Sequence, residues 1–222
     1  MTTSEHMPSF DLTYANLKTL SSDPPVFTID NFLAPSQCNH IKELALKYGD
    51  KVDTSRTYII HQNPSENAVA ASKNVRSSTT FYLNISYVEE ICQKISKLTG
   101  YPTSTFEEPQ VLRYKKGQYY TWHQDAIPTG KTNPYAGNRL ATILIYLNTI
   151  PVKGNNNQSG FTIFQKLNLS VQPEQGKCLI FFPCFLTGAP DARTVHCSSP
   201  VLEEGEEKWM LQIWIYQRPY LN

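Results

Sequence analysis

The feature that most constrains the fold is a series of short strand-like runs that begins near residue 110. These runs are separated by turn glycines at intervals typical of an antiparallel sandwich or barrel, and they span residues 111–114, 140–148, 161–164, 178–182 and 209–217. In the last run both alternating sets of side chains are bulky, which predicts a strand covered on both faces. The second half of the chain is therefore predicted to form two β-sheets.

Two helical patterns precede these runs. The first follows Pro35 and ends at Gly49, with one apolar side made of Ile41, Leu44, Ala45 and Tyr48. The second starts at Ser86, whose spacing to Glu89 predicts a capping box, and ends at Gly100; its apolar stripe is Val88, Ile91, Ile95 and Leu98. We expect both helices to cover one face of the sheets, so the fold class is α+β, mainly β.

The first 25 residues are polar, show no sustained period and end in Ser-Ser-Asp-Pro-Pro. They predict a flexible N-terminal arm over residues 1–25, followed by one continuous domain over 26–222. A chain of 222 residues is long enough to bury a core without disulfides. Its five cysteines form no Cys-x-x-Cys pair and mostly have apolar neighbours, which predicts reduced, packed thiols.

Charge and hydropathy exclude several classes of partner. The 20 Lys and Arg residues nearly balance the 19 Asp and Glu residues, giving a net charge of +1, so no nucleic-acid partner is expected. The apolar runs are far shorter than the roughly 20 residues of a membrane-spanning helix, so no membrane partner is expected either. No basic and apolar leader opens the chain, which makes a cytoplasmic location the default expectation.

The strongest candidates for a functional site are His123 and Asp125, together with His196 far downstream. On a strand, residues two apart share a face, so the first two side chains could share one metal ion. A later strand could bring His196 as the third ligand. Two imidazoles and one carboxylate on one face of an ion, with the opposite positions open, suit non-haem Fe(II). The alternative is that these histidines are ordinary packed or surface groups.

Lys208 opens the final strand, after an acidic stretch at 203–207. A lysine that pointed inward there would be too unfavourable unless it met an anion, and a dicarboxylate co-substrate would supply one. The alternative is an exposed lysine at the start of a strand. Other catalytic motifs are missing: Gly130-Lys131-Thr132 lacks the upstream glycine of a phosphate-binding loop, and there is no Gly-x-Ser-x-Gly elbow.

Several motifs occur in one order along the chain: Val-Leu-Arg-Tyr at 111–114, Gly-Gln-Tyr-Tyr at 117–120, His-Gln-Asp at 123–125, Arg-Leu-Ala-Thr at 139–142, Gly-Phe-Thr-Ile-Phe at 160–164, then His196 and Lys208-Trp209. Together they resemble the catalytic core of the prolyl 4-hydroxylase group of 2-oxoglutarate and Fe(II)-dependent dioxygenases. Residues 26–33 and 74–78 resemble that family's opening strand and its Val-Arg-x-Ser-Ser segment. The resemblance spans about residues 26 to 220.

The resemblance implies a double-stranded β-helix, or jelly roll, supported by the N-terminal helices. It implies that His123, Asp125 and His196 hold Fe(II) and that Lys208 pairs with the distal carboxylate of 2-oxoglutarate. Tyr114 and Thr162 match family positions that help to hold this co-substrate. O2 would be the second co-substrate and ascorbate an added reductant.

Five further residues match family positions that face the peptide substrate: Arg76, Glu107, Tyr120, Arg139 and Trp214. Each also has a purely structural interpretation, as a core aromatic ring or a surface charge. The chain departs from the family in its longer, more acidic loop before Lys208, and in having Ser159-Gly160-Phe161-Thr162 where Gly-Gly-Glu-Thr is common. These departures leave the choice of substrate open.

The resulting hypothesis is a dioxygenase that hydroxylates prolyl residues in a peptide or protein. One alternative is an enzyme of the same fold that acts on another side chain or on a free amino acid. Another is a non-catalytic jelly-roll protein that binds a metal or a ligand. A zinc hydrolase is a further possibility, but it would leave Lys208 without a role. The sequence does not predict the oligomeric state.

Overall fold

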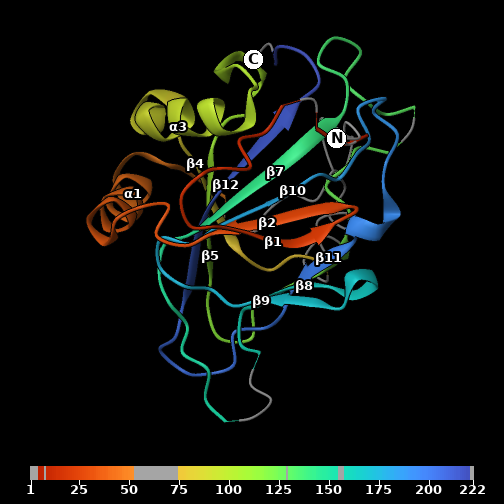
Figure 1. Ribbon diagram of the computed structural model, residues 1–222. Coiled ribbons are helices and arrows are strands. Elements are labelled where there is room, and N and C mark those ends of the chain that lie inside the picture. Colours follow the sequence, from red (N-terminus) through yellow and green to blue (C-terminus); the bar gives the residue numbers. More distant parts are fainter. Residues whose placement is uncertain (1–4, 8, 53–74, 129, 155–157, 221–222) are drawn as a thin grey trace.

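Two antiparallel sheets form the β-fold of this computed structural model (Figure 1). The eight-stranded sheet has the order β1-β2-β10-β7-β12-β5-β4-β3, and the four-stranded sheet has the order β6-β11-β8-β9. The large sheet consists of β1 (Leu17–Ser22), β2 (Pro25–Ile29), β3 (Asp50–Val52), β4 (Thr79–Tyr82), β5 (Gln110–Tyr114), β7 (Arg139–Tyr146), β10 (Cys178–Phe181) and β12 (Lys208–Tyr216). The small sheet consists of β6 (Tyr120–His123), β8 (Thr162–Phe164), β9 (Leu169–Val171) and β11 (His196–Ser198).

The structure describes residues 5–7, 9–52, 75–128, 130–154 and 158–220. Residues 1–4 and 8 of the predicted arm lie outside the described residues, as do 53–74, 129, 155–157 and 221–222 of the predicted domain. Within the described part, the five predicted strand runs are confirmed, with ends that differ by one or two residues. The α+β, mainly β class is confirmed as well.

Two α-helices, α1 (Pro35–Tyr48) and α3 (Glu89–Thr99), pack on one side of the large sheet, while β8, β9 and β11 lie on the other side (Figure 1). The predicted ends are confirmed, since α1 stops at Gly49 and α3 stops at Gly100 in the left-handed conformation. Short 3₁₀ turns complete the fold: η1 (Ile85–Val88), η2 (Thr103–Thr105), η3 (Gln165–Leu167) and η4 (Ala192–Thr194).

Two details of the predicted helices are wrong. Ser86 does not cap α3: the side chain of Asn84 accepts a hydrogen bond from the Ser86 amide, which starts the tight turn η1, and α3 begins only at Glu89. Tyr48 is not buried under α1, because its ring is exposed and stacks on Tyr87 instead, with 5.2 Å between ring centroids. The first difference is a local turn before α3, and the second is a contact between α1 and η1. The periodicity of one helix describes neither.

The expected loose arm is also wrong in part, because Leu17–Ser22 form β1 and pair with β2 along the edge of the large sheet. The Lys18 ammonium group lies 2.5 Å from a carboxylate oxygen of Asp30, and Phe10 stacks on Phe27 at 4.8 Å between centroids. Only Leu17 and Leu20 of β1 are apolar, and both are partly buried. The rest of the strand can be polar because one face of an edge strand meets water. The polar composition of residues 1–25 therefore does not indicate that the whole segment is without regular structure.

Strand β12 is covered on both faces, as predicted, and its two faces contact different parts of the protein. Leu211 and Ile213 point into the apolar core between the large sheet and the helices. Lys208, Met210 and Gln212 point to the other side, where they line a cavity beneath the small sheet. The neighbouring strands β5 and β7 alternate in the same way, so the large sheet contributes its functional side chains, such as Tyr114, Thr142 and Lys208, from one face.

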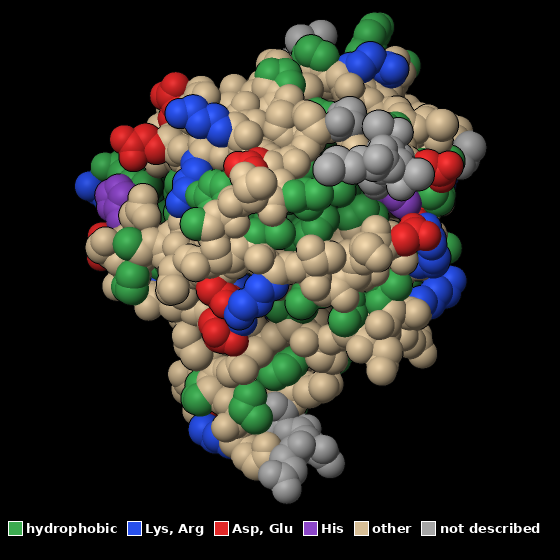
Figure 2. All heavy atoms as spheres, viewed as in Figure 1, with side chains coloured by type: hydrophobic (Ala, Val, Ile, Leu, Met, Phe, Trp, Pro, Cys, Tyr) green, Lys and Arg blue, Asp and Glu red, His purple; other side chains and the backbone are tan. Residues whose placement is uncertain are grey.

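All five cysteines are free and buried, which confirms the prediction of packed thiols. Among the described residues, none of the helices has the length and apolar content needed to cross a bilayer. Acidic and basic side chains are interspersed over the described surface drawn in Figure 2.

Gly176 lies in the turn before β10, where its backbone links the end of β7 to the segment before α1. Its amide donates to the Tyr146 carbonyl at 2.9 Å and its carbonyl accepts from the Leu33 amide at 3.1 Å. Its φ is +81°, and a Cβ atom would lie 2.2 Å from the Leu33 carbonyl oxygen. Gly117 has a similar φ of +77°, but a Cβ atom there would meet nothing within 4 Å. A side chain at Gly117 would therefore meet backbone strain alone, whereas a side chain at Gly176 would also meet a steric conflict.

We expect Gly117→Ala to lower the free energy of unfolding by about 1 kcal/mol, because alanine is strained at positive φ. Gly176→Ala should cost about 1 to 3 kcal/mol more, because backbone atoms must also move to admit the methyl group. Urea denaturation of both variants measures the difference. Equal losses would mean that the contact with Leu33 does not constrain the fold.

Candidate metal and co-substrate site

The small sheet brings His123 and His196 face to face. His123 ends β6, His196 begins β11, and the two residues are direct partners in the antiparallel pairing of these strands. Asp125 follows two residues after His123, but β6 has ended by then, so Asp125 lies in a bend rather than on the strand. The shared face therefore comes from the bend after His123 and not from strand alternation, which corrects the expected geometry.

The three side chains converge on one point. Their candidate ligand atoms all lie within 4.8 Å of one another. A carboxylate oxygen of Asp125 is 3.5 Å from Nε2 of His123, and the other oxygen is 3.8 Å from Nε2 of His196. Asp125 and His196 are buried, and His123 is partly buried. This arrangement can hold one metal ion with two imidazoles and one carboxylate on one face.

Hydrogen bonds orient each of these groups. Nδ1 of His123 lies 2.8 Å from the Thr121 carbonyl oxygen, and Nδ1 of His196 lies 3.1 Å from the Thr194 carbonyl oxygen. A carbonyl can only accept, so each Nδ1 carries the proton and each Nε2 presents a lone pair to a metal. The Thr142 hydroxyl donates to Asp125 Oδ2 at 2.8 Å. Thr142 lies on β7 within the motif at 139–142, but nothing in the sequence sets it apart from its neighbours.

The site favours a neutral His196 and an ionised Asp125. Burial and the neighbouring His123 lower the pKa of His196 to about 4. Burial opposes the charge of Asp125, but His196 and His123 outweigh this effect and hold the pKa of Asp125 well below its usual range. A metal ion binds deprotonated ligands, so both shifts prepare the site for a cation.

Lys208 lies deeper in the same region and is fully buried. Its ammonium group donates to the Ser198 hydroxyl at 2.8 Å and lies 5.3 Å and 5.6 Å from the ring centroids of Tyr114 and Tyr146. Among the described residues, no carboxylate forms an ion pair with it. Burial lowers its pKa to about 7. Lys208 is therefore a buried cation that would gain from an anionic ligand, not the exposed lysine of the alternative interpretation.

The expected co-substrate residues line a narrow cavity together with Lys208. It contains Tyr114, Thr162, Ser198, His123 and His196, so it reaches from the lysine to the histidine pair. The Tyr146 hydroxyl donates to the Thr162 hydroxyl at 2.8 Å. Tyr146 and Ser198 were missed in the sequence, because only the pairing of distant strands places them around Lys208.

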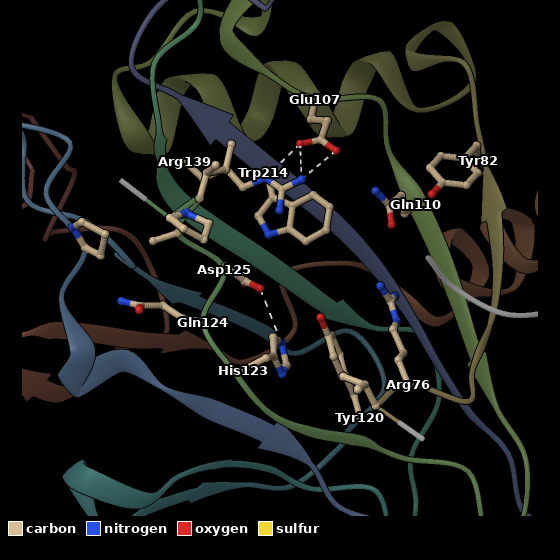
Figure 3. Close-up of a pocket in the computed structure, with 15 residues that line it drawn as sticks. Arg76, Tyr82, Glu107, Gln110, Tyr120, His123, Gln124, Asp125, Arg139 and Trp214 are labelled. Atoms are coloured by element: carbon tan, nitrogen blue, oxygen red, sulfur yellow. Dashed lines mark hydrogen bonds and ion pairs between the residues drawn. The ribbon is translucent and has the colours of Figure 1, made fainter. Parts of the chain in front are cut away.

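A larger pocket of about 490 Å³ opens beside the triad (Figure 3). The five predicted substrate residues all line it: Arg76, Glu107, Tyr120, Arg139 and Trp214. His123 and Asp125 line it too, and Tyr120 and His123 also belong to the narrow cavity. The two spaces therefore meet at the candidate metal position.

Glu107 and Arg139 bind each other across one wall of this pocket. The guanidinium donates to both carboxylate oxygens, with contacts of 3.0, 3.0 and 2.7 Å, and lies 3.5 Å from the ring centroid of Trp214 (Figure 3). Burial disfavours the charge of Arg139, but Glu107 outweighs this and raises its pKa above the usual range. The pair thus fixes the indole at the pocket wall.

At the opposite wall, the rings of Tyr120 and His123 stack with centroids 3.4 Å apart, and the Arg76 guanidinium lies 4.8 Å from the Tyr120 centroid. Arg76 Nη2 and Trp214 Nε1 are buried donors without a hydrogen-bond partner among the described residues. Two such donors in one pocket suit a ligand that offers hydrogen-bond acceptors.

Other residues that line the larger pocket were not predicted from the sequence, among them Tyr82, Gln110, Gln124 and Pro190. Tyr82 and Gln110 pair across β4 and β5 near Arg76, whereas Gln124 lies on the other side of His123 (Figure 3). Gln110 had a signal, because it shares an alternating face with Tyr114 on β5. Pro190 had none, since it reaches the pocket from a loop.

Comparison with known proteins identifies the same part of the chain. Residues 109–216 match the family model of the 2OG-Fe(II) oxygenase superfamily. Prolyl 4-hydroxylase 13 of Arabidopsis thaliana is 28% identical over 221 residues, which cover 90% of this chain and 74% of that protein. The matched region contains the triad and Lys208.

Solved structures share the fold. Viral collagen prolyl hydroxylase from Paramecium Bursaria Chlorella virus-1, in complex with 2OG, superposes with a TM-score of 0.62 at 24% identity, covering 86% of this chain and 95% of that one. A prolyl hydroxylase from Trichoplax adhaerens, in complex with a hypoxia inducible factor peptide fragment, superposes with a TM-score of 0.58 at 18% identity, covering 93% and 86%. The predicted jelly-roll core is thereby confirmed.

The lowered pKa of His196 predicts how stability depends on pH in the metal-free protein. Between the ordinary value of 6.5 and about 4, the unfolded chain binds a proton on this histidine and the folded protein does not. Stability should therefore fall as the pH falls through this range, by up to roughly 3 kcal/mol. Denaturation with a chelator present, at a series of pH values, measures this slope. His196→Asn should flatten it, whereas substitution of the exposed His40 by Asn should leave it unchanged.

Proposed function

We propose that this 2-oxoglutarate and Fe(II)-dependent oxygenase of the prolyl 4-hydroxylase type hydroxylates a prolyl residue in a peptide or protein. The proposal rests on one observation: the narrow cavity and the larger pocket meet at the triad. One contains a buried cation without an anionic partner among the described residues, and the other is a pocket walled by aromatic rings and unpaired donors. An oxygenase of this type needs its co-substrate and its target on two sides of one metal ion.

In this proposal His123, Asp125 and His196 hold the iron, which when bound supplies the activation of O2 coupled to oxidative decarboxylation of 2-oxoglutarate. The protein contributes orientation and protection from water. Thr121 and Thr194 fix the imidazole rings through Nδ1, and Thr142 holds one oxygen of Asp125. Three protein ligands leave the remaining positions to the substrates.

Lys208 would bind the distal carboxylate of 2-oxoglutarate. Its ammonium group is held by Ser198, and a carboxylate beside it would offset the unfavourable burial of the charge. The hydroxyl groups of Tyr114 and Thr162 would complete the polar end of this cavity, with Thr162 held by Tyr146. The 2OG bound to the viral collagen prolyl hydroxylase is consistent with such a cavity in this fold.

The larger pocket would take the prolyl residue. Tyr120 and Trp214 would provide aromatic walls for the ring, and Arg76 Nη2 and Trp214 Nε1 would donate to backbone carbonyls of an extended chain. We infer a different role for Glu107 and Arg139 from the one that the sequence predicted. Because they bind each other, they would hold Trp214 in place rather than each gripping the peptide.

If Lys208 binds 2-oxoglutarate, its substitution should stabilise the fold but prevent binding of the co-substrate. Lys208→Met should raise the free energy of unfolding by roughly 2 to 4 kcal/mol at pH 7, because it removes a buried charge without a partner carboxylate. It should also abolish binding of 2-oxoglutarate to the Mn(II)-loaded protein, measured by calorimetry. Lys153→Met is the matched control, since Lys153 is exposed and paired with Glu206 at 2.7 Å; its effect on stability should stay below about 1 kcal/mol. Unchanged 2-oxoglutarate affinity in Lys208→Met would refute the assignment.

The proposed reaction is tested with proline-rich peptides incubated with the protein, Fe(II), 2-oxoglutarate and ascorbate. Fragmentation mass spectrometry should locate one added oxygen atom on a prolyl residue, together with succinate in solution. His123→Ala should lower both products to background, because the metal loses a ligand. His40→Ala, at an exposed histidine on α1, should retain the native rate.

The outcomes separate the alternatives. An oxygen atom found on a lysyl or asparaginyl side chain, or on a free amino acid, would favour the same-fold enzyme with another target. Succinate at background for both the native protein and His123→Ala would exclude the oxygenase and leave a non-catalytic binding protein or a zinc hydrolase.

A further inference from the structure

The N-terminal residues Glu5 and His6 lie against the loop that leads to His196. The Leu186 amide donates to the Glu5 carbonyl at 2.7 Å, and His6 Nε2 lies 2.9 Å from Asp191 Oδ2. Both side chains of the His6–Asp191 pair are only 3% exposed. The His6 ring also packs on Phe185, with 4.5 Å between centroids. His6, in a segment that the sequence suggested to be loose, is therefore buried against the loop that leads to His196.

Asp191 organises the turn η4 that follows it. Its carboxylate accepts from the Arg193 amide at 2.9 Å and from the Arg193 side chain at 2.7 to 3.1 Å. Its backbone carbonyl accepts from the Thr194 amide at 3.1 Å and from the Thr194 hydroxyl at 2.7 Å. Burial opposes the charge, but the hydrogen bonds from Arg193 and His6 outweigh it and lower the pKa of Asp191 to about 2. Asp191 is thus a buried carboxylate around which the turn is built.

The same turn ends at the group that orients His196. Thr194, fixed by two hydrogen bonds to Asp191, presents its carbonyl to Nδ1 of His196 at 3.1 Å. A continuous series of contacts therefore runs from His6 through Asp191 and Thr194 to the imidazole. A shift of the turn would change both the direction of the ring and the carbonyl that selects its tautomer.

We propose that Asp191 and His6 are positioning residues for His196, so that the N-terminal segment contributes to the geometry of the metal site. The inference rests on the proposed function, because it concerns an imidazole assigned there to iron. His6 touches neither metal nor substrate in this scheme. It acts by holding the Asp191 carboxylate at Oδ2, the oxygen that also accepts from the Arg193 side chain. Outer groups that orient a metal-bound imidazole commonly change metal affinity by about 10-fold to 100-fold.

The test uses the full-length metal-free protein and Co(II), whose visible absorption reports the geometry of its ligands. We expect His6→Ala to weaken Co(II) binding, measured by calorimetry, by about 10-fold and to alter the absorption spectrum. His6→Gln should restore most of the affinity, because its amide nitrogen can reach the position of the imidazole Nε2. His6→Asn, which is shorter, should not. His40→Ala controls for the loss of a histidine elsewhere.

Two results would overturn the inference alone. One is native Co(II) affinity and an unchanged spectrum in folded His6→Ala. The other is equal affinities for His6→Gln and His6→Asn, which would show that the reach of the side chain to Asp191 is immaterial. If the first result came with a lower melting temperature, His6 would have a structural role only. If the native protein and His196→Ala bound Co(II) equally weakly, the proposed metal site itself would fail.

Discussion

The site depends on one constraint, the alternation of side chains along the central strands β5, β7 and β12. These strands are buried on both faces, so each must supply apolar side chains to the helices on one side. The residues between them point beneath the small sheet, where Tyr114, Thr142 and Lys208 occur in place of further apolar groups. A shift of one residue in any of these strands would exchange core and site. The packing of the helices therefore fixes the site as firmly as it fixes the core.

The buried charged groups around the two connected spaces differ in how many opposite charges and hydrogen bonds they have. Asp125 has two histidines and the Thr142 hydroxyl within reach, and Arg139 has the full carboxylate of Glu107. Lys208 has one serine hydroxyl and two aromatic rings. Proteins commonly break the rule of polar satisfaction at functional sites, and the cost in folding free energy can be recovered when a ligand of opposite charge binds. The least compensated group thus marks where an anionic ligand is expected.

Much of this site could be predicted from the sequence because its parts are short motifs. His123 and Asp125 are two residues apart, whereas the pairing of Lys208 with 2-oxoglutarate and the substrate-facing residues came from the resemblance of the ordered motifs to the prolyl 4-hydroxylase group. The structure brings all the predicted site residues into two connected spaces. Contacts that motifs do not describe were missed, as with Thr142, or assigned differently, as with Glu107 and Arg139. The polar N-terminal segment was misjudged, since edge strands and isolated anchors leave little trace in composition.

Along regular strands such as β12, the sequence by itself determined which side chains share a face, because periodicity fixes the direction of each side chain relative to its neighbours. It did not do so for Asp125, which lies in a bend after β6. It also determined where the helices stop and which residues carry the chemistry to bind a metal. Only the tertiary structure decided that β6 pairs with β11 and so sets His123 opposite His196. The contacts of His6 with Asp191 and of Glu107 with Arg139 are likewise seen only in the tertiary structure. Such contacts depend on strand order and register, and these follow from packing the whole chain at once rather than from any local pattern.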